Sequence, residues 1–354
     1  MRSLCAFSAS LLRKFRHPLR ATRRTVAAEM GDKPRWKVYI SRRILPEAYD
    51  FLKERCDIEM WDHNDVVPRQ ELLDRVSGKD GLLCQLTEKI DEELLDAAGP
   101  NLKVISTMSV GYDHVKVQLL RDRNILFGNT PGVLTDATAE LTVALLLTTS
   151  RRLVEGTQHV KNGTWGTWKA DWMCGPGLAD STVGIVGLGR IGQAIGRRLR
   201  PFGVARFLYT GHSPKPEAEK ELGAEFVSLD GLLQESDFVV VCCALTAETK
   251  GMFNSSAFQK MKQSAVFINT SRGAVVNQED LVKALESGTI AYAGLDVTTP
   301  EPLPTDSPLL KLTNCVVLPH IGSATIKTRT AMAMLSAHNL LTALEGEPMP
   351  AQVK

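Results

Sequence analysis

The chain has 354 residues, of which 44% are hydrophobic and 23% are charged, and its formal net charge is +2. This length exceeds what one hydrophobic core usually supports, and the composition is that of an ordinary globular protein, which excludes the disordered and fibrous classes. The longest strongly apolar run begins at Val143 and is far shorter than the roughly 20 residues of a membrane span, so no membrane partner is predicted.

The first 28 residues differ from the rest of the chain. They carry seven basic side chains and no acidic one, and they are rich in Ser, Thr, Ala and Leu. This composition predicts a mitochondrial transit peptide over residues 1–29. Two alternatives stay open: a disordered basic tail, and translation that begins at Met30 and leaves the protein in the cytoplasm. The remaining 35 basic and 40 acidic side chains make the folded part mildly acidic, which argues against a nucleic-acid partner.

The seven cysteines show neither C-x-x-C spacing nor the compact framework of a disulfide-rich protein. Three of them lie inside apolar runs, so we expect reduced structural thiols. The sequence also lacks a cluster of metal-ligand residues, and no metal site is predicted.

From about Trp36 the sequence alternates short apolar runs with helical segments, the pattern of parallel α/β architecture. The first predicted strands are residues 36–41, 81–86 and 102–108. The predicted helices between them are residues 46–55 and 68–76. A long apolar helix is predicted over 135–153, with an N-cap candidate at Thr135 or Asp136 and two arginines near its end. We expect this helix to bridge two domains.

An irregular, glycine-broken segment follows, and it holds three of the chain's five tryptophans, Trp165, Trp168 and Trp172. Large aromatic side chains on such a segment are expected to be buried against another surface. A subunit interface, a substrate-facing edge and ordinary domain packing stay open as that surface.

A second series of apolar runs then begins. Its predicted strands are residues 182–187, 206–210, 238–243, 265–270, 291–297 and 315–319. These runs lie between glycine-rich turns and helical stretches, which predicts a second doubly wound unit. Only 34 residues follow His320. Because they are too few for a third domain, we expect their helix-like part to pack on the first unit.

The motif Gly187-x-Gly189-x-x-Gly192 directly follows the first strand of this second series and opens a helix. The first glycine permits a tight turn, the second lets the backbone approach a pyrophosphate, and the third lets helix and strand pack closely. We therefore predict a dinucleotide site at these glycines, with Arg190 and Ile191 beside them. A packing turn without a ligand is the alternative.

The predicted fold class is α/β, with two doubly wound domains. A Rossmann cofactor domain, residues 135–320, is inserted into a discontinuous flavodoxin-like substrate domain, residues 30–134 and 321–354.

The stretch after the second strand of the cofactor domain carries no acidic residue. An NAD site usually places Asp or Glu there to bind the adenosine ribose, whereas this chain has Gly211, His212, Ser213 and Lys215. A carboxylate would repel the additional phosphate of NADP, so its absence favours NADP. Histidine is only partly charged at neutral pH and clamps phosphate less firmly than arginine. Use of both NADPH and NADH therefore stays open.

Several polar residues follow predicted strands, where ligands bind in open α/β sheets. They are Arg272, Asp296, Glu301 and His320 in the second unit, and the Val110–Gly111 turn in the first. Together they suit the reduction of a small 2-oxo acid. Arg272 and the amides of the turn can bind a carboxylate. His320 can protonate the carbonyl oxygen, and Glu301 can orient its ring.

Each of these residues also has a structural explanation on its own. Arg272 suits a surface charge, His320 a packed or exposed side chain near a proline, Glu301 a turn, and Asp296 a helix cap. Their joint position at strand ends of one cofactor-type domain favours the functional interpretation.

The segments "VGIVGLGRIGQAIGRRL", "INTSRGAVVN", "AGLDVTTPEPLP" and "LPHIGSAT" resemble the D-2-hydroxyacid dehydrogenase family in order and spacing. The resemblance implies Arg272, Glu301 and His320 as the catalytic set and substrate binding at Val110 and Gly111. It also implies a homodimer formed through the cofactor domains. The implied cofactor contacts include Thr270, Gly322 and Asp296, the last near the nicotinamide.

A narrower resemblance, in "NLKVISTMSVGYDH", "GVLTDATAELTVALLLTT", "FGVARFLYTG" and "LEGEPMP", is to members that reduce glyoxylate to glycolate and hydroxypyruvate to D-glycerate with NADPH. Those relatives commonly carry Arg at the position of His212. The alternatives are another D-2-hydroxyacid dehydrogenase, and a nucleotide-sensing corepressor-like scaffold of the same fold. The absence of a long C-terminal tail argues against the scaffold, and formate dehydrogenases pair Gln, not Glu, with the histidine.

Overall fold

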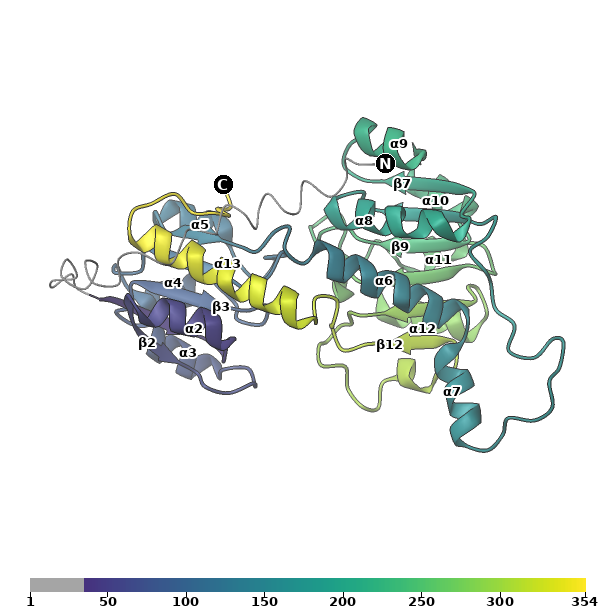
Figure 1. Cartoon of the computed structure of the whole chain (residues 1–354), viewed down its shortest axis with the longest axis horizontal. Helices are drawn as coiled ribbons and strands as arrows, with labels where there is room; N and C mark the ends of the chain where they lie inside the picture. The colour runs from purple at the N-terminus through teal and green to yellow at the C-terminus, as the bar shows by residue number, and fades with distance from the viewer. Residues whose placement is uncertain (1–34) are drawn as a thin grey trace, which may run out of the picture.

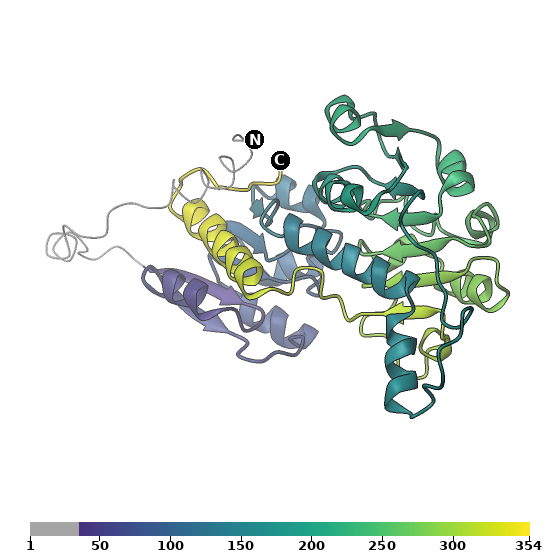
Figure 2. The same ribbon diagram turned by 45° about the vertical axis from the view of Figure 1, so that its right-hand side comes forward.

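A computed structural model describes residues 35–354. The predicted transit peptide, residues 1–29, and the alternative start at Met30 lie outside the described residues. Two parallel sheets with helices on their faces lie side by side (Figures 1 and 2). Within the described residues, no helix is long and apolar enough to cross a membrane.

The first sheet has five parallel strands in the order β2-β1-β3-β4-β5. They are β1 (Trp36–Ile40), β2 (Cys56–Met60), β3 (Gly81–Cys84), β4 (Val104–Thr107) and β5 (Leu126–Gly128). The three predicted strands are confirmed as β1, β3 and β4, whose side chains are mostly buried. The two edge strands, β2 and β5, were not predicted from the sequence.

Helices cover both faces of this sheet. They are α2 (Pro46–Lys53), α3 (Arg69–Val76), α4 (Glu92–Ala98), α5 (Val117–Asp122) and α13 (Ile326–Leu344). The C-terminal helix α13 packs on α2, β3 and β4, which lie much earlier in the sequence (Figure 1, yellow). Its buried side chains Met332, Ala337 and Leu340 join the same core as Val38 and Val104.

The second sheet has seven parallel strands in the order β12-β11-β10-β9-β6-β7-β8. They are β6 (Thr182–Val186), β7 (Arg206–Thr210), β8 (Ala224–Phe226), β9 (Phe238–Val241), β10 (Val266–Asn269), β11 (Tyr292–Leu295) and β12 (Cys315–Val317). Six of them match the predicted strands, and the three-residue edge strand β8 was missed. The chain order reverses between β6 and β9, and such a switch point is where open α/β sheets bind ligands.

Alternate residues of the central strands enter two separate cores. On β9, Val239 and Val241 pack on one face of the sheet, whereas Phe238 and Val240 pack on the other. A strand covered on both faces needs apolar side chains at every position, which explains the continuous apolar runs of the sequence. The helices that cover these faces are α6 (Thr135–Ser150), α8 (Arg190–Leu199), α9 (Pro216–Leu222), α10 (Leu229–Glu235), α11 (Ser255–Gln259) and α12 (Gln278–Glu286).

Helix α6 connects the two sheets. Leu134, just before it, packs in the core of the first sheet that contains Val38 and Val104. Ala139 packs in the core of the second sheet that contains Phe238 and Val240. The predicted helix 135–153 was too long, because α6 ends at Ser150. Arg152 adopts a left-handed φ of 52°, and a separate helix α7 (Leu153–Lys161) starts there.

The predicted fold class is confirmed. It is an α/β fold of two doubly wound units, and the second unit is inserted between the parts of the first. The boundaries at residues 135 and 320 stay a prediction.

Candidate active site

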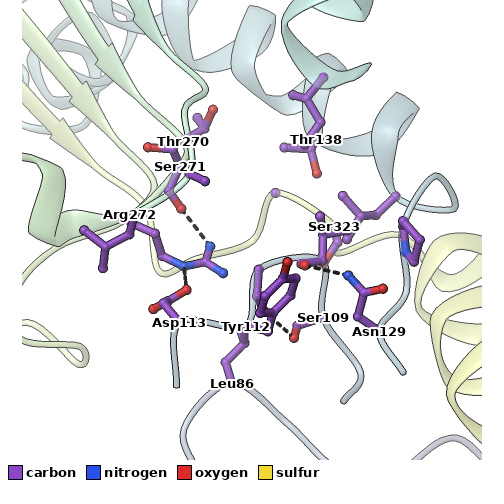
Figure 3. Close-up of a pocket in the computed structure, with 18 of the residues that line it drawn as sticks. Leu86, Ser109, Tyr112, Asp113, Asn129, Thr138, Thr270, Ser271, Arg272 and Ser323 are labelled. Atoms are coloured by element: carbon purple, nitrogen blue, oxygen red, sulfur yellow. Dashed lines mark hydrogen bonds and ion pairs between the residues drawn. The ribbon is translucent and has the colours of Figure 1, made fainter. Parts of the chain in front are cut away.

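A cavity of about 640 Å³ lies between the two sheets, and residues of both sheets line it. The Val110–Gly111 turn comes from the first unit and His320 from the second. Figure 3 shows Tyr112 of the first unit and Arg272 of the second at this cavity. The volume falls within the range of about 300–1,000 Å³ for small-molecule sites.

The glycine motif forms the turn between β6 and α8. Gly187 has a φ of +96°, and a Cβ on it would lie 2.8 Å from the Cys243 amide nitrogen. A Cβ on Gly192 would lie 2.4 Å from the Gly187 carbonyl oxygen, whereas a Cβ on Gly189 would meet nothing within 4 Å. The first and third glycines are therefore required by the fold, and the second leaves open space at the start of α8. This space and the helix N-terminus fit a pyrophosphate.

The stretch Gly211–Lys215 lies beside this turn, because the Gly187 amide donates to the Thr210 carbonyl at 2.9 Å. The buried Tyr209 hydroxyl donates to the Glu219 carboxylate and accepts from the Lys215 amide. The Glu219 carboxylate is therefore held at the tyrosine. Residues 211–216 contain no acid. His212 and Lys215 are exposed, so the charged side chains within residues 211–216 are basic.

Arg272 follows β10 and reaches across to the first sheet (Figure 3). Its Nε donates to Asp113 Oδ1 at 2.8 Å, and its Nη1 donates to the Ser271 carbonyl at 2.9 Å. A Cβ on Gly111 would lie 1.8 Å from Arg272 Nη2, so the guanidinium lies directly against the backbone of the turn. Cation and turn thus meet in one place.

The Val110–Gly111 turn is fixed by hydrogen bonds to its carbonyl groups. The Ser109 hydroxyl donates to the Gly111 carbonyl at 2.7 Å, and Asn129 Nδ2 donates to the Val110 carbonyl at 2.9 Å. These bonds set the planes of the turn's peptide groups before any ligand arrives.

His320 and Glu301 form a pair at the second sheet. The distance between His320 Nδ1 and Glu301 Oε2 is 2.8 Å, and Glu301 Oε1 accepts from the Thr298 amide at 3.0 Å. Burial favours the neutral carboxyl, but the hydrogen bond and charge of His320 outweigh it and hold the pKa of Glu301 below its usual value. The ionised Glu301 therefore orients the imidazole, and Nε2 is left for a substrate.

Asp296 lies just after β11 and is 1% exposed. Its two carboxylate oxygens accept from the amides of Ile321 and Gly322, each at 2.8 Å. Asp296 therefore anchors the turn that carries His320, rather than capping a helix after its own strand. Burial raises the pKa of Asp296 despite these two bonds.

The cavity brings together most of the predicted site residues: Val110, Gly111, Arg190, Ile191, Thr270, Arg272, Asp296, His320 and Gly322. Glu301 contacts His320 and does not line the cavity itself. The others lie along the glycine turn and the end of β7: Gly187, Gly189, Gly192, Gly211, His212, Ser213 and Lys215. Their individual roles stay predictions.

Two residues of the site, Asp113 and Arg329, were not predicted from the sequence. Asp113 is separated from Arg272 by 159 positions, and no sequence signal links the two residues. Arg329 lies on α13 and lines the cavity. Burial lowers the pKa of Arg329, and the nearby charge of Asp296 opposes that effect. In residues 35–354, no group of three or more His, Cys, Asp or Glu side chains could hold a metal ion.

The family model of the D-isomer specific 2-hydroxyacid dehydrogenase NAD-binding domain matches residues 143–322. The chain is also 59% identical to the human glyoxylate reductase/hydroxypyruvate reductase over 320 residues, which are 90% of this chain and 98% of the human one. It belongs to the D-isomer specific 2-hydroxyacid dehydrogenase family. The prediction of an oxidoreductase of this family is confirmed.

Further proteins are similar to this chain in sequence or in structure. A mouse glyoxylate reductase/hydroxypyruvate reductase is 61% identical over 88% of this chain and 94% of its own length. A crystal structure of a Thermus thermophilus protein has a TM-score of 0.83 and 44% identity, and the match covers 90% of this chain and 100% of that one. An NADPH-dependent glyoxylate/hydroxypyruvate reductase from Sinorhizobium meliloti, solved with NADP and malonate, has a TM-score of 0.77 and 32% identity over 90% and 97% of the two chains.

Proposed function

We propose that this enzyme reduces glyoxylate to glycolate and hydroxypyruvate to D-glycerate, with NADPH as the preferred reductant. The relatives named for these two reactions match the chain over nearly its whole length. The observation that carries the proposal is the cavity in which Arg272 lies against the Val110–Gly111 turn and His320 is paired with Glu301.

Arg272 and the turn bind the substrate carboxylate. The planar guanidinium offers several N–H donors, and the backbone of Gly111 lies against it without a side chain in the way. A 2-oxo acid bound here presents its carbonyl group to the cavity that His320 lines.

His320 supplies the proton. When NADPH is bound, its nicotinamide supplies the hydride, and negative charge develops on the substrate oxygen. A histidine hydrogen-bonded through Nδ1 to an ionised carboxylate can carry a proton on Nε2 and donate it to that oxygen. Glu301 stabilises the imidazolium before transfer and keeps the ring in one orientation.

The basic stretch after β7 supports the preference for NADPH. His212 and Lys215 are exposed beside the glycine turn, and Glu219 is bonded to Tyr209. No carboxylate within residues 211–216 would repel a 2′-phosphate. A histidine clamps a phosphate less firmly than an arginine, so NADH stays a second reductant, and His212→Arg should sharpen the preference for NADPH.

The enzyme acts as a homodimer formed through the cofactor domains. Several apolar side chains on α7 and the following segment are exposed in the single chain, among them Leu153, Val160, Trp165 and Trp168, with Trp168 82% exposed. Large apolar side chains exposed at several positions of one segment are typical of a protein interface. Analytical ultracentrifugation should show a dimer, and Trp168→Glu should shift it toward monomer.

Residues 1–29 direct the protein to mitochondria, and translation from Met30 would give a cytoplasmic form. Import of the full chain into isolated mitochondria, compared with a chain that starts at Met30, tests this proposal. Import of both chains or of neither would contradict it.

The central experiment measures initial rates of the purified full chain with glyoxylate and hydroxypyruvate, each with NADPH and with NADH. Fast turnover that favours NADPH is expected. Turnover that favours NADH would keep the reaction and overturn the cofactor preference. Tight nucleotide binding without turnover of either acid would overturn the reaction and favour the corepressor-like scaffold.

A further inference from the structure

We infer that Asp113 is a positioning residue for the reduction: it holds the Arg272 guanidinium in the orientation that binds the substrate carboxylate. The inference rests on the proposed function, in which Arg272 is the group that binds this carboxylate. Asp113 itself follows the substrate-binding turn.

The contacts of the guanidinium divide its donors into two sets. Asp113 takes the Nε hydrogen at 2.8 Å, and the Ser271 carbonyl takes one Nη1 hydrogen at 2.9 Å (Figure 3). A guanidinium has five N–H groups in one plane. Those that remain belong to the two Nη atoms, and Nη2 lies against Gly111 at the cavity. The ion pair thus leaves the outer edge of the fork for a carboxylate.

The same ion pair joins the two halves of the carboxylate site. Asp113 lies on the turn after β4 in the first unit, and Arg272 follows β10 in the second. Holding Arg272 by its Nε fixes it next to the Val110–Gly111 backbone. Burial opposes ionisation of the Asp113 carboxyl, but the charge and hydrogen bond of Arg272 outweigh it and lower its pKa, so Asp113 is ionised at neutral pH.

Asp113 has two opposing effects on an anionic substrate. Its negative charge repels a carboxylate and partly neutralises Arg272. Its hydrogen bond orders a long, flexible side chain in advance, so that less conformational entropy is lost on binding. A positioning residue is one for which the second effect dominates. Substitutions that separate charge from geometry can therefore test the inference.

Three variants of the full chain make this separation. Asp113→Asn keeps an Oδ1 acceptor for Arg272 Nε and removes the charge. Asp113→Glu keeps the charge and displaces the acceptor, and Asp113→Ala removes both. The matched control is Asp62→Ala, which breaks another Nε–Oδ1 ion pair, the one between Arg43 and Asp62 at 2.7 Å on the exposed surface.

The primary readout is calorimetric binding of oxamate, a carboxylate that cannot be reduced, to the NADPH-saturated protein. Steady-state KM and kcat for glyoxylate provide the second readout. We expect Asp113→Ala and Asp113→Glu to weaken oxamate binding and raise KM by roughly tenfold or more, the effect of losing one charge-assisted hydrogen bond. Asp113→Asn should stay within about threefold of the wild type, kcat should fall less than KM rises, and NADPH affinity should not change.

Oxamate affinity that follows charge alone would overturn the inference. In that case Asp113→Asn and Asp113→Ala would both bind oxamate more tightly than the wild type, and Asp113→Glu would equal it. Equal affinity in all variants would overturn it as well. If Asp113→Ala does not fold, the comparison of Asp113→Asn with Asp113→Glu decides between the two roles. A wild type that binds oxamate but reduces no 2-oxo acid would refute the proposed function, while the binding series would still test the role of Asp113.

Discussion

Replacing His114 with glutamine should make the stability of the enzyme less sensitive to acid. His114 lies directly after Asp113, and its Nε2 is 3.2 Å from the Thr107 hydroxyl. Burial lowers the pKa of His114 from 6.5 to about 4; Asp113 and Glu88 oppose this effect, and Arg272 adds to it. Between these two values the unfolded chain binds a proton that the folded chain does not bind. The free energy of unfolding therefore rises with pH across this interval.

The size of this effect follows from the two pKa values. They lie about 2.5 pH units apart, and each unit corresponds to about 1.4 kcal/mol, so His114 makes the free energy of unfolding about 3 kcal/mol larger above pH 6.5 than below pH 4. Near pH 5 the slope due to this residue is about 1 kcal/mol per pH unit. His114 lies mostly inside the protein, so solvent screens this contribution little.

Urea unfolding followed by tryptophan fluorescence, between pH 5 and pH 7.5, measures the slope. The variant His114→Gln keeps a group that can hydrogen-bond Thr107 and removes the titration, so its slope near pH 5 should be about 1 kcal/mol per pH unit shallower than that of the wild type. The control for loss of a histidine is His63→Gln, because His63 is exposed and lies shortly after β2 in the first unit. Equal slopes for wild type and His114→Gln would refute the assignment of this proton to His114.

Three further predictions concern the site itself. His320→Ala should lower kcat by roughly 10²- to 10⁴-fold if His320 is the proton donor, and near-normal turnover would exclude that role. Arg272→Ala should raise the KM for glyoxylate with little change in the dissociation constant of NADPH. Unchanged KM and kcat would count against carboxylate binding by Arg272. Gly189→Ala should weaken nucleotide binding without changing thermal stability, because the added Cβ meets no protein atom within 4 Å. Gly192→Ala should lower the melting temperature, because the added Cβ would lie 2.4 Å from the Gly187 carbonyl oxygen. Similar melting temperatures for the two glycine variants would contradict this explanation.

The sequence predicted the central strands because their environment imposes a simple pattern. A strand buried on both faces needs an unbroken apolar run, and β6, β9 and β10 have one. The edge strands β2, β5 and β8 were missed because they are very short or mix charged with apolar residues, whereas the edge strand β12 is apolar throughout and was predicted. The break between α6 and α7 was missed because the left-handed residue there is an arginine, not a glycine.

The reactive residues were predictable for a related reason. The carboxyl ends of parallel strands meet at one edge of a sheet, so Arg272, Asp296 and His320 could be brought together from strand order alone. The ion pair of Arg272 with Asp113 could not be predicted from strand order. It depends on how the two units sit against each other, and no local pattern encodes that arrangement. The function of Asp296 as an anchor for the Ile321 and Gly322 amides likewise depends on the conformation of the turn, which no local sequence pattern encodes.

Proton donation and carboxylate binding, as proposed above, depend differently on the contact between the two units. His320, Glu301 and Asp296 all belong to the second unit, where His320 is bonded to Glu301, and Asp296 accepts from the amide of Ile321, the residue after His320. The proposed carboxylate site, by contrast, exists only where Arg272 meets the turn of the first unit, and the Asp113 ion pair spans that junction. Separation of the units would therefore leave the proposed proton donor in place and dismantle the proposed carboxylate site. A substrate that bridges Arg272 and the Val110–Gly111 turn favours the joined arrangement, so binding of the correct acid and alignment with His320 occur in the same step.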